Sequence, residues 1–135
     1  MKKLLLLPAV CLILFGCADK KAQEQSLRDS VIAIHEKVMG EDGKLEDNKT
    51  ALSAFIKANP TGPLADSANF FIGKLTLADS AMMIWMHGFN PELTKSHEEN
   101  MVYLARQKQL IMQVDSQLNA ALGVSTQFIA KTKTK

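Results

Sequence analysis

Apolar residues recur along the chain at spacings of three and four, which is the repeat of one face of an α-helix. In the first half, this pattern predicts a helix from about residue 24, carried by Leu27, Val31, Ile34 and Val38. Glycines at positions 40 and 43 interrupt the pattern before it resumes. The stretch 24–57 is therefore either one kinked helix or two helical pieces.

A turn separates the two halves of the pattern. The sequence NPTGP at residues 59–63 contains two prolines and a glycine, which stop a helix. A second helix is predicted over 65–88, with an apolar seam formed by Phe71, Leu75, Ala78, Met82, Trp85 and Phe89. The alternating spacings of four and three indicate the heptad rhythm of helices packed at a shallow angle.

A third helix is predicted over 91–122. Asn90 would be its N-cap and Pro91 its first residue, while Gly123 would end it before a weakly ordered tail. No segment alternates between apolar and polar residues as a strand does. The predicted fold class is therefore all-α, an antiparallel three-helix up-down bundle, with four segments if 24–57 is broken.

The N-terminus reads MKKLLLLPAVCLILFGC, in which two lysines precede an apolar stretch too short for a permanent membrane span. This pattern is typical of a signal peptide, and Gly16 before Cys17 resembles the bacterial lipobox. The lipobox implies diacylglycerol on the Cys17 sulfur, cleavage before Cys17 and acylation of the new N-terminus. The alternative is an ordinary secretory signal with a chance cysteine. The predicted organisation is a signal peptide (1–16), a lipidated cysteine and polar tether (17–25), a helical bundle (26–122) and a flexible tail (123–135).

The cysteines and the net charge argue against several classes of function. Cys11 would leave with the signal peptide and Cys17 would be acylated, so the mature chain would lack a free thiol. The formal net charge is +2, and removal of Lys2 and Lys3 would leave a neutral chain without a basic stripe. We therefore expect no binding to nucleic acid. No nucleophile elbow, phosphate loop or catalytic pair is recognisable, so we expect no enzymatic activity.

Each of the three histidines has a methionine one helical turn away. The pairs are His35 with Met39, Met83 with His87, and His97 with Met101. Residues four apart share a helix face, so each pair can present an imidazole and a thioether together. Folding the chain back at 59–63 and again near residue 90 would bring the three pairs to one level of the bundle.

Thioether and imidazole groups are ligands suited to Cu(I) or Ag(I) rather than to Mg²⁺ or Ca²⁺. The candidate metal ligands are His35, Met39, Met83, Met86, His87, His97 and Met101. The competing interpretation is core packing, because methionine fills irregular gaps in helical cores. Apart from such a metal, the only group expected on the chain is the covalent lipid on Cys17.

Two segments resemble a known family. VIAIHEKVM (31–39) and LADSAMMIWMHGF (77–89) are similar to segments of short Bacteroidetes-type helical lipoproteins, which often carry the label "viral A-type inclusion protein". The matching residues are His35, Glu36, Val38, Met39, Ala78, Met82, Trp85, Met86, His87 and Phe89. The chain departs from the family pattern by one extra residue before the tryptophan and by the less helical MGEDGKLED (39–47). The resemblance covers the lipobox and about 27–118, and it implies a cell-envelope lipoprotein of unassigned function.

These observations predict a membrane-anchored envelope lipoprotein that acts as a non-enzymatic interaction or structural module. The alternative is a periplasmic protein that binds Cu(I) or Ag(I). Ala18 rather than an aspartate follows Cys17, which favours the outer membrane, facing the periplasm. The expected partners are the membrane, through the lipid, and an envelope protein, while the heptad seam leaves the oligomeric state open.

Overall fold

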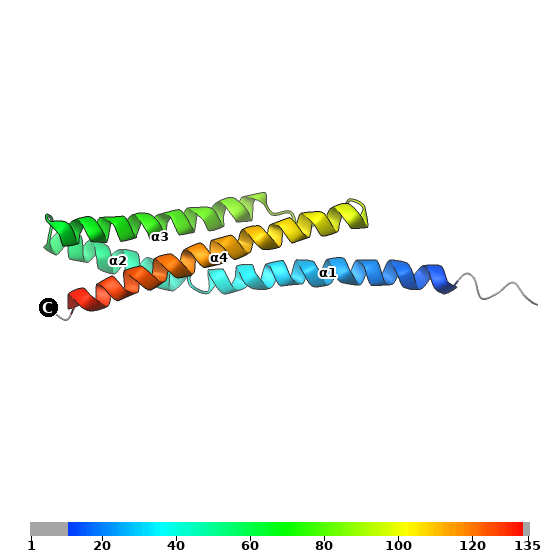
Figure 1. Ribbon diagram of the computed structural model, residues 1–135, viewed down its shortest axis with the longest axis horizontal. Helices are drawn as coiled ribbons and strands as arrows, with labels where there is room; N and C mark the ends of the chain where they lie inside the picture. The colour runs from blue at the N-terminus through cyan, green and yellow to red at the C-terminus, as the bar shows by residue number, and fades with distance from the viewer. Residues whose placement is uncertain (1–10, 134–135) are drawn as a thin grey trace, which may run out of the picture.

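A computed structural model describes residues 11–133 of the chain, with side chains from residue 18 onward. Within that range the structure consists of four helices and contains no strand (Figure 1). The helices are α1 (Cys11–Met39), α2 (Asp42–Ala58), α3 (Pro63–Gly88) and α4 (His97–Lys133). The predicted all-α fold class is confirmed.

The first two helices run parallel to α4, and α3 runs in the opposite direction (Figure 1). Three side-chain contacts spread along the bundle join α1 or α2 to α4 at separations of 77 or 78 residues, namely Lys20 with Glu98, Lys37 with Asp115, and Asn48 with Ser125 and Thr126. Because the separation is nearly constant, α1 and α2 together keep one register against α4 along its length. The chain is therefore an up-down-up bundle, with α4 packed against every other helix.

Buried side chains recur every seven residues along α1 and α2 together, along α3 and along α4. The sets are Val31, Val38, Leu45 and Leu52 in α1 and α2, Ala68, Leu75 and Met82 in α3, and Leu104, Ile111, Leu118 and Ser125 in α4. A seven-residue repeat keeps the same face of a helix against its partner, as in coiled coils. The predicted heptad seam of α3 thus continues through the whole bundle.

The break between α1 and α2 is a tight turn at Gly40 and Glu41. Gly40 N donates to Glu36 O and Glu41 N donates to Val38 O, each at 3.0 Å, so helical hydrogen bonding tightens at the end of α1. Val38 and Leu45 keep their seven-residue spacing across the turn. Of the two predicted alternatives, two helical pieces are observed, but they pack in the register of one helix.

The predicted turn at 59–63 is present. Gly62 adopts φ = 101°, a left-handed conformation that glycine reaches without steric cost. Pro63 then occupies the first position of α3, where its missing N–H costs no hydrogen bond. The chain therefore reverses here because of local backbone chemistry.

The start of α4 differs from the prediction, since the helix begins at His97 and not at Pro91. Ser96 and Glu99 form a capping box, in which Glu99 N donates to Ser96 Oγ (3.3 Å) and Ser96 N donates to Glu99 Oε2 (3.2 Å). Asn90 instead accepts a bond from the nearby Glu92 N (2.9 Å) within the loop 89–96. The Asn-Pro pair thus shapes a turn, and the capping box starts the helix.

The end of α4 also differs from the prediction. Gly123 does not end the helix, which continues to Lys133, so most of the predicted flexible tail (123–135) is helical. Ser125 is fully buried, and Phe128 packs against aromatic rings of α2 and α3. Packing of the continued heptad seam outweighs the weak helix propensity of one glycine.

The predicted polar tether (17–25) is helical as part of α1, which extends past the start of α4 (Figure 1). Glu24 already contacts α4, so the bundle begins inside the segment predicted to be a tether. Residues 1–10 of the predicted signal peptide lie outside the described residues. Across residues 11–133, none of the helices is both long and apolar enough to cross a membrane.

Candidate functional site

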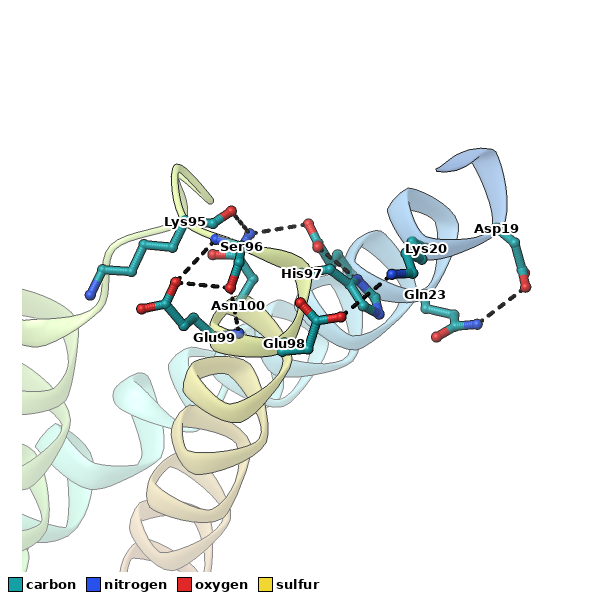
Figure 2. A network of polar contacts seen from close by, with 10 residues as sticks. Asp19, Lys20, Gln23, Lys95, Ser96, His97, Glu98, Glu99 and Asn100 are labelled. Atoms are coloured by element: carbon teal, nitrogen blue, oxygen red, sulfur yellow. Dashed lines mark hydrogen bonds and ion pairs between the residues drawn. The ribbon is translucent and has the colours of Figure 1, made fainter. Parts of the chain in front are cut away.

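Polar side chains meet where α4 begins beside α1 (Figure 2). His97 Nδ1 donates to Glu24 Oε1 at 2.9 Å, and Asn100 Nδ2 lies 3.4 Å from the other carboxylate oxygen of Glu24. Asn100 is buried, and the side chains of Glu24 and His97 are only 15% and 20% exposed. We call these three residues the polar corner. Glu24 and His97 lie seven residues before the buried seam residues Val31 and Leu104, so polar groups take core positions at this end.

Exposed charges surround the polar corner. Lys20 Nζ lies 3.4 Å from Glu98 Oε1, and a backbone hydrogen bond together with Lys20 lowers the pKa of Glu98. Hydrogen bonds from the Ser96 hydroxyl and backbone likewise lower the pKa of Glu99. Both carboxylates are therefore held in the charged form in the first turn of α4, where the helix dipole favours negative charge.

A pocket of about 580 Å³ lies between the loop 89–96 and the first turns of α4. Its charged lining side chains are Glu92, Lys95, Glu98, Glu99 and Arg106. Because the two signs are mixed and the pocket is open, this arrangement selects neither an anion nor a cation.

A column of aromatic rings connects α1, α3 and α4. The centroids of His35 and Trp85 are 5.5 Å apart, those of Trp85 and Phe89 4.9 Å, and those of Phe89 and Tyr103 6.4 Å. Tyr103 also accepts a hydrogen bond from Asn90 N at 2.7 Å, which fixes the loop that follows α3. Within the column, His35 Nε2 and Trp85 Nε1 are buried without a hydrogen-bond partner.

The three predicted His–Met pairs do not meet at one level. Lys37 contacts Asp115, so His35 lies level with Gln113 of α4. Gln113 is sixteen residues from His97, which corresponds to about 24 Å of helix. The convergence prediction is wrong because the loop 89–96 carries the chain past the end of α3 before α4 begins. His97 belongs to the polar corner, and half-buried Met101 lies one turn further along α4.

The other candidate ligands lie where α1 ends and α3 ends. The contact between His35 and Trp85 puts these two helix ends side by side. Met39, Met83 and Met86 are partly exposed there, and the exposed His87 donates from Nδ1 to the carbonyl oxygen of Met83 at 2.7 Å. Among residues 18–133, no group of three His, Cys, Asp or Glu side chains is placed to hold a metal ion. A site here would therefore depend on thioether ligands.

A groove of about 420 Å³ separates α3 from α4 on one side of the bundle. None of the residues that line it is charged, and they are Ala81, Ile84, Trp85, Gly88, Gln107, Leu110, Gln113, Val114 and Gln117. We call it the α3–α4 groove. It differs from the contact of α1 with α4, where Lys37 bonds Asp115 at 2.9 Å, and from that of α2 with α3, where Lys49 bonds Asp79 at 3.2 Å.

Three large apolar side chains of α3 are exposed in one row, and the last of them, Ile84, lines this groove. Phe70, Leu77 and Ile84 are 59%, 60% and 74% exposed and lie seven residues apart, so they form one row, here called the α3 ridge. The ammonium of Lys74 lies over the Phe70 ring, 5.3 Å from its centroid. The ridge thus resembles a second heptad seam on the outer face of a helix whose first seam is already buried.

Sequence reasoning did not find the α3 ridge or the polar corner. The ridge has a signal in the sequence, because Phe70, Leu77 and Ile84 repeat every seven residues beside the predicted seam. The polar corner has none, since Glu24 and His97 are 73 residues apart and nothing local links them.

Comparisons with models of protein families, with curated proteins and with solved structures return no match. The side chain of Cys17, the predicted lipid attachment site, lies outside the described side chains.

Proposed function

We propose that this chain is a lipid-anchored envelope lipoprotein that acts as a non-enzymatic interaction module. Its binding surface would be the α3 ridge together with the α3–α4 groove. The observation that carries this proposal is the row of three large apolar side chains that are each more than half exposed and that ends at Ile84 in an uncharged groove. Large apolar side chains exposed along one face of a helix are characteristic of an interaction site.

The contacts of α2 with α3 and of α1 with α4 provide the supporting contrast. Desolvation lowers the pKa of Lys49, but the hydrogen bonds and charges of Glu46 and Asp79 outweigh it, so this pKa is raised overall. Lys49 thus stays protonated and joins α2 to α3, while Lys37 and Asp115 join α1 to α4. The α3–α4 groove has glutamine and apolar side chains instead. It suits the apolar face of another helix.

The anchor is the second part of the proposal. Acylation of Cys17 would hold the start of α1 at a membrane, which we expect to be the outer membrane facing the periplasm. Two or more acyl chains make such anchoring stable, whereas a single chain is marginal. The test is incorporation of labelled palmitate into the full chain, which should disappear in Cys17→Ser.

The binding surface is tested by a photo-cross-linking amino acid placed at Leu77 or Ile84 of the full chain in intact cells. We expect a covalent adduct from both positions, weakened by the additional change Phe70→Glu. The matched control position is Met112, which is 50% exposed on α4 and does not line the groove. Equal adduct formation from Met112 and from the ridge would contradict the proposed surface.

A second function, binding of Cu(I) or Ag(I), is favoured by one observation. The buried Nε2 of His35 has no hydrogen-bond partner, so in the tautomer that carries its proton on Nδ1 this nitrogen can bind a metal ion. The thioethers of Met39, Met83 and Met86 would complete a soft-metal site near it, with His87 at its edge. We expect a Cu(I) titration against a chromophoric chelator to lose its endpoint in His35→Ala and to keep it in His97→Ala.

A further inference from the structure

We propose that one end of the bundle rests directly on the headgroups of membrane phospholipids. This end consists of the start of α1, the loop 89–96 and the first turn of α4, and we call it the membrane seat. The inference rests on the proposed function, because it starts from the lipid on Cys17, and it adds a second contact with the same membrane. The partner is a zwitterionic phospholipid, whose headgroup carries a phosphate and an ammonium.

A short length of helix separates the lipid from the bundle. Lys20 follows Cys17 by three residues within α1, which corresponds to about 4.5 Å of helix. The Lys20 ammonium nitrogen lies 3.4 Å from the carboxylate of Glu98 in the first turn of α4. The headgroup layer on one side of a bilayer is about 5–7 Å deep. The first turn of α4 therefore lies at the level of the headgroups, and no length of chain is left for a spacer.

The start of α1 is fixed to α4 and cannot act as a flexible tether. One turn after Lys20, Glu24 accepts a hydrogen bond from His97 Nδ1 at 2.9 Å and lies 3.4 Å from Asn100 Nδ2. These three side chains of the polar corner are mostly buried. Contacts in two successive turns keep α1 from bending away from α4. A lipid on Cys17 would thus bring the end of the whole bundle to the membrane.

The charges of the membrane seat favour a headgroup that carries both signs. Glu92 and Lys95 of the loop and Glu98 of α4 line the pocket at this end. The Lys95 side chain extends away from α1, while Lys20 is paired with Glu98 (Figure 2). An anionic membrane surface attracts clusters of lysine and arginine, whereas lysines and carboxylates are mixed here. The phosphate of a zwitterionic headgroup fits beside the lysines, and its ammonium fits beside the carboxylates.

The proposed protein-binding surface lies away from the membrane seat. The α3 ridge ends at Ile84, and α3 itself ends at Gly88. On α4 the α3–α4 groove begins at Gln107, ten residues after His97, which corresponds to about 15 Å of helix. A bundle that stands on its seat therefore holds the ridge and the groove above the headgroups, where another protein can reach them. A bundle on its side would place the ridge against the membrane.

Short-range fluorescence quenching tests the seat with the full chain, expressed and processed in cells. After loss of Cys11 and acylation of Cys17, a cysteine introduced by Thr94→Cys or Thr61→Cys is the only thiol that takes a fluorophore. Both threonines are exposed, Thr94 in the loop 89–96 and Thr61 in the turn before α3. The 26 residues of α3 extend about 39 Å between these two regions. The labelled lipoprotein is reconstituted in vesicles of phosphatidylethanolamine and phosphatidylcholine, with a nitroxide on some of the headgroups.

The fluorophore at position 94 should be quenched severalfold more than the one at position 61, because a nitroxide acts only at short range. Equal quenching at both positions would show a bundle on its side and would overturn the seat. Quenching at neither position, in vesicles that carry the protein on flotation, would reveal a spacer, which overturns the seat and keeps the anchor. Failure to float together with absence of palmitate labelling would overturn the anchor, and the seat with it.

The choice of lipid is tested in the same assay. Part of the phosphatidylcholine is replaced by the anionic phosphatidylglycerol, and we expect the quenching at position 94 to stay the same. Quenching that develops only when phosphatidylglycerol is present would overturn the zwitterionic partner, because the seat would then depend on the negative charge of the membrane.

Discussion

The two ends of the bundle are built in different ways. At the end formed by α2, α3 and α4, three helices surround fully or almost fully buried side chains such as Leu52, Leu75 and Leu118. At the end formed by α1 and α4, α3 has already ended, and Glu24 and His97 occupy the seam. Three helices can exclude water from an apolar core, whereas the contact between two helices stays partly exposed to solvent. Polar contacts at such a position specify register more than they add stability.

The largest expected effect is at the three-helix end. Leu75 is fully buried, so Leu75→Ala should lower the free energy of unfolding by about 2–5 kcal/mol, through lost burial and a new cavity. The matched control is Leu77→Ala two residues away, where the side chain is 60% exposed. Guanidinium titrations followed by far-UV circular dichroism measure both. Similar losses in the two variants would contradict the assignment of the buried and exposed faces of α3.

A smaller effect is expected from the buried amide in the three-helix end. Asn48 Nδ2 donates to Ser125 Oγ at 2.8 Å and to Thr126 Oγ1 at 2.9 Å. Asn48→Ala leaves these hydroxyls without their donor, and we expect a loss of about 1–3 kcal/mol. The same titration measures it. The double variant Asn48→Ala with Ser125→Ala should cost less than the sum of the single variants, because the two residues interact.

At the two-helix end, the expected effect is local. Glu24→Gln removes the charge that accepts from His97, so we expect a loss of about 1 kcal/mol in total stability. Hydrogen exchange should become faster at the start of α4 and in the facing part of α1, and should be unchanged around Leu52. Faster exchange throughout the bundle would show that the polar corner stabilises the whole bundle and not only its two-helix end.

The smallest effect concerns the capping box. Hydrogen bonds from Ser96 lower the pKa of Glu99 in the folded chain, so the stabilisation they give is present above the ordinary glutamate pKa. It is lost as the pH falls through the lowered pKa of Glu99. Ser96→Ala should move this pKa upward toward its ordinary value, as measured by an NMR titration of the side-chain carboxyl. An unchanged pKa would mean that the capping box does not hold the carboxylate.

The fold was largely predictable because its seam is periodic. The spacing of Phe71, Leu75 and Met82 predicts α3 almost to its ends, and the glycine and prolines of 59–63 predict the turn. The boundaries of α4 were not predictable in the same way. Asn90-Pro91 and Ser96 with Glu99 are both helix-start patterns, and the periodic pattern alone does not say which of them begins α4.

The candidate site was less predictable than the fold. Helical spacing correctly places a histidine beside a methionine within one helix, since that relation is local. Whether His35 meets His97 depends on the length of the loop 89–96 and on a register set by contacts 73 to 78 residues apart. Such long-range register has no signature in a single sequence, whereas the seven-residue repeat of Phe70, Leu77 and Ile84 does.

The uninterrupted length of α4 has a mechanical consequence. Its 37 residues extend about 55 Å, so α4 packs against both α1 and α2 across the turn at Gly40. Without α4, this turn would be a hinge between α1 and α2. The N-terminal end of α1 and the C-terminal end of α4 lie at opposite ends of the bundle (Figure 1). A pull between a membrane at Cys17 and a load near Lys133 would therefore stress the contact of α1 with α4 in shear. All its side-chain contacts would then have to slip together, whereas peeling would break them one after another.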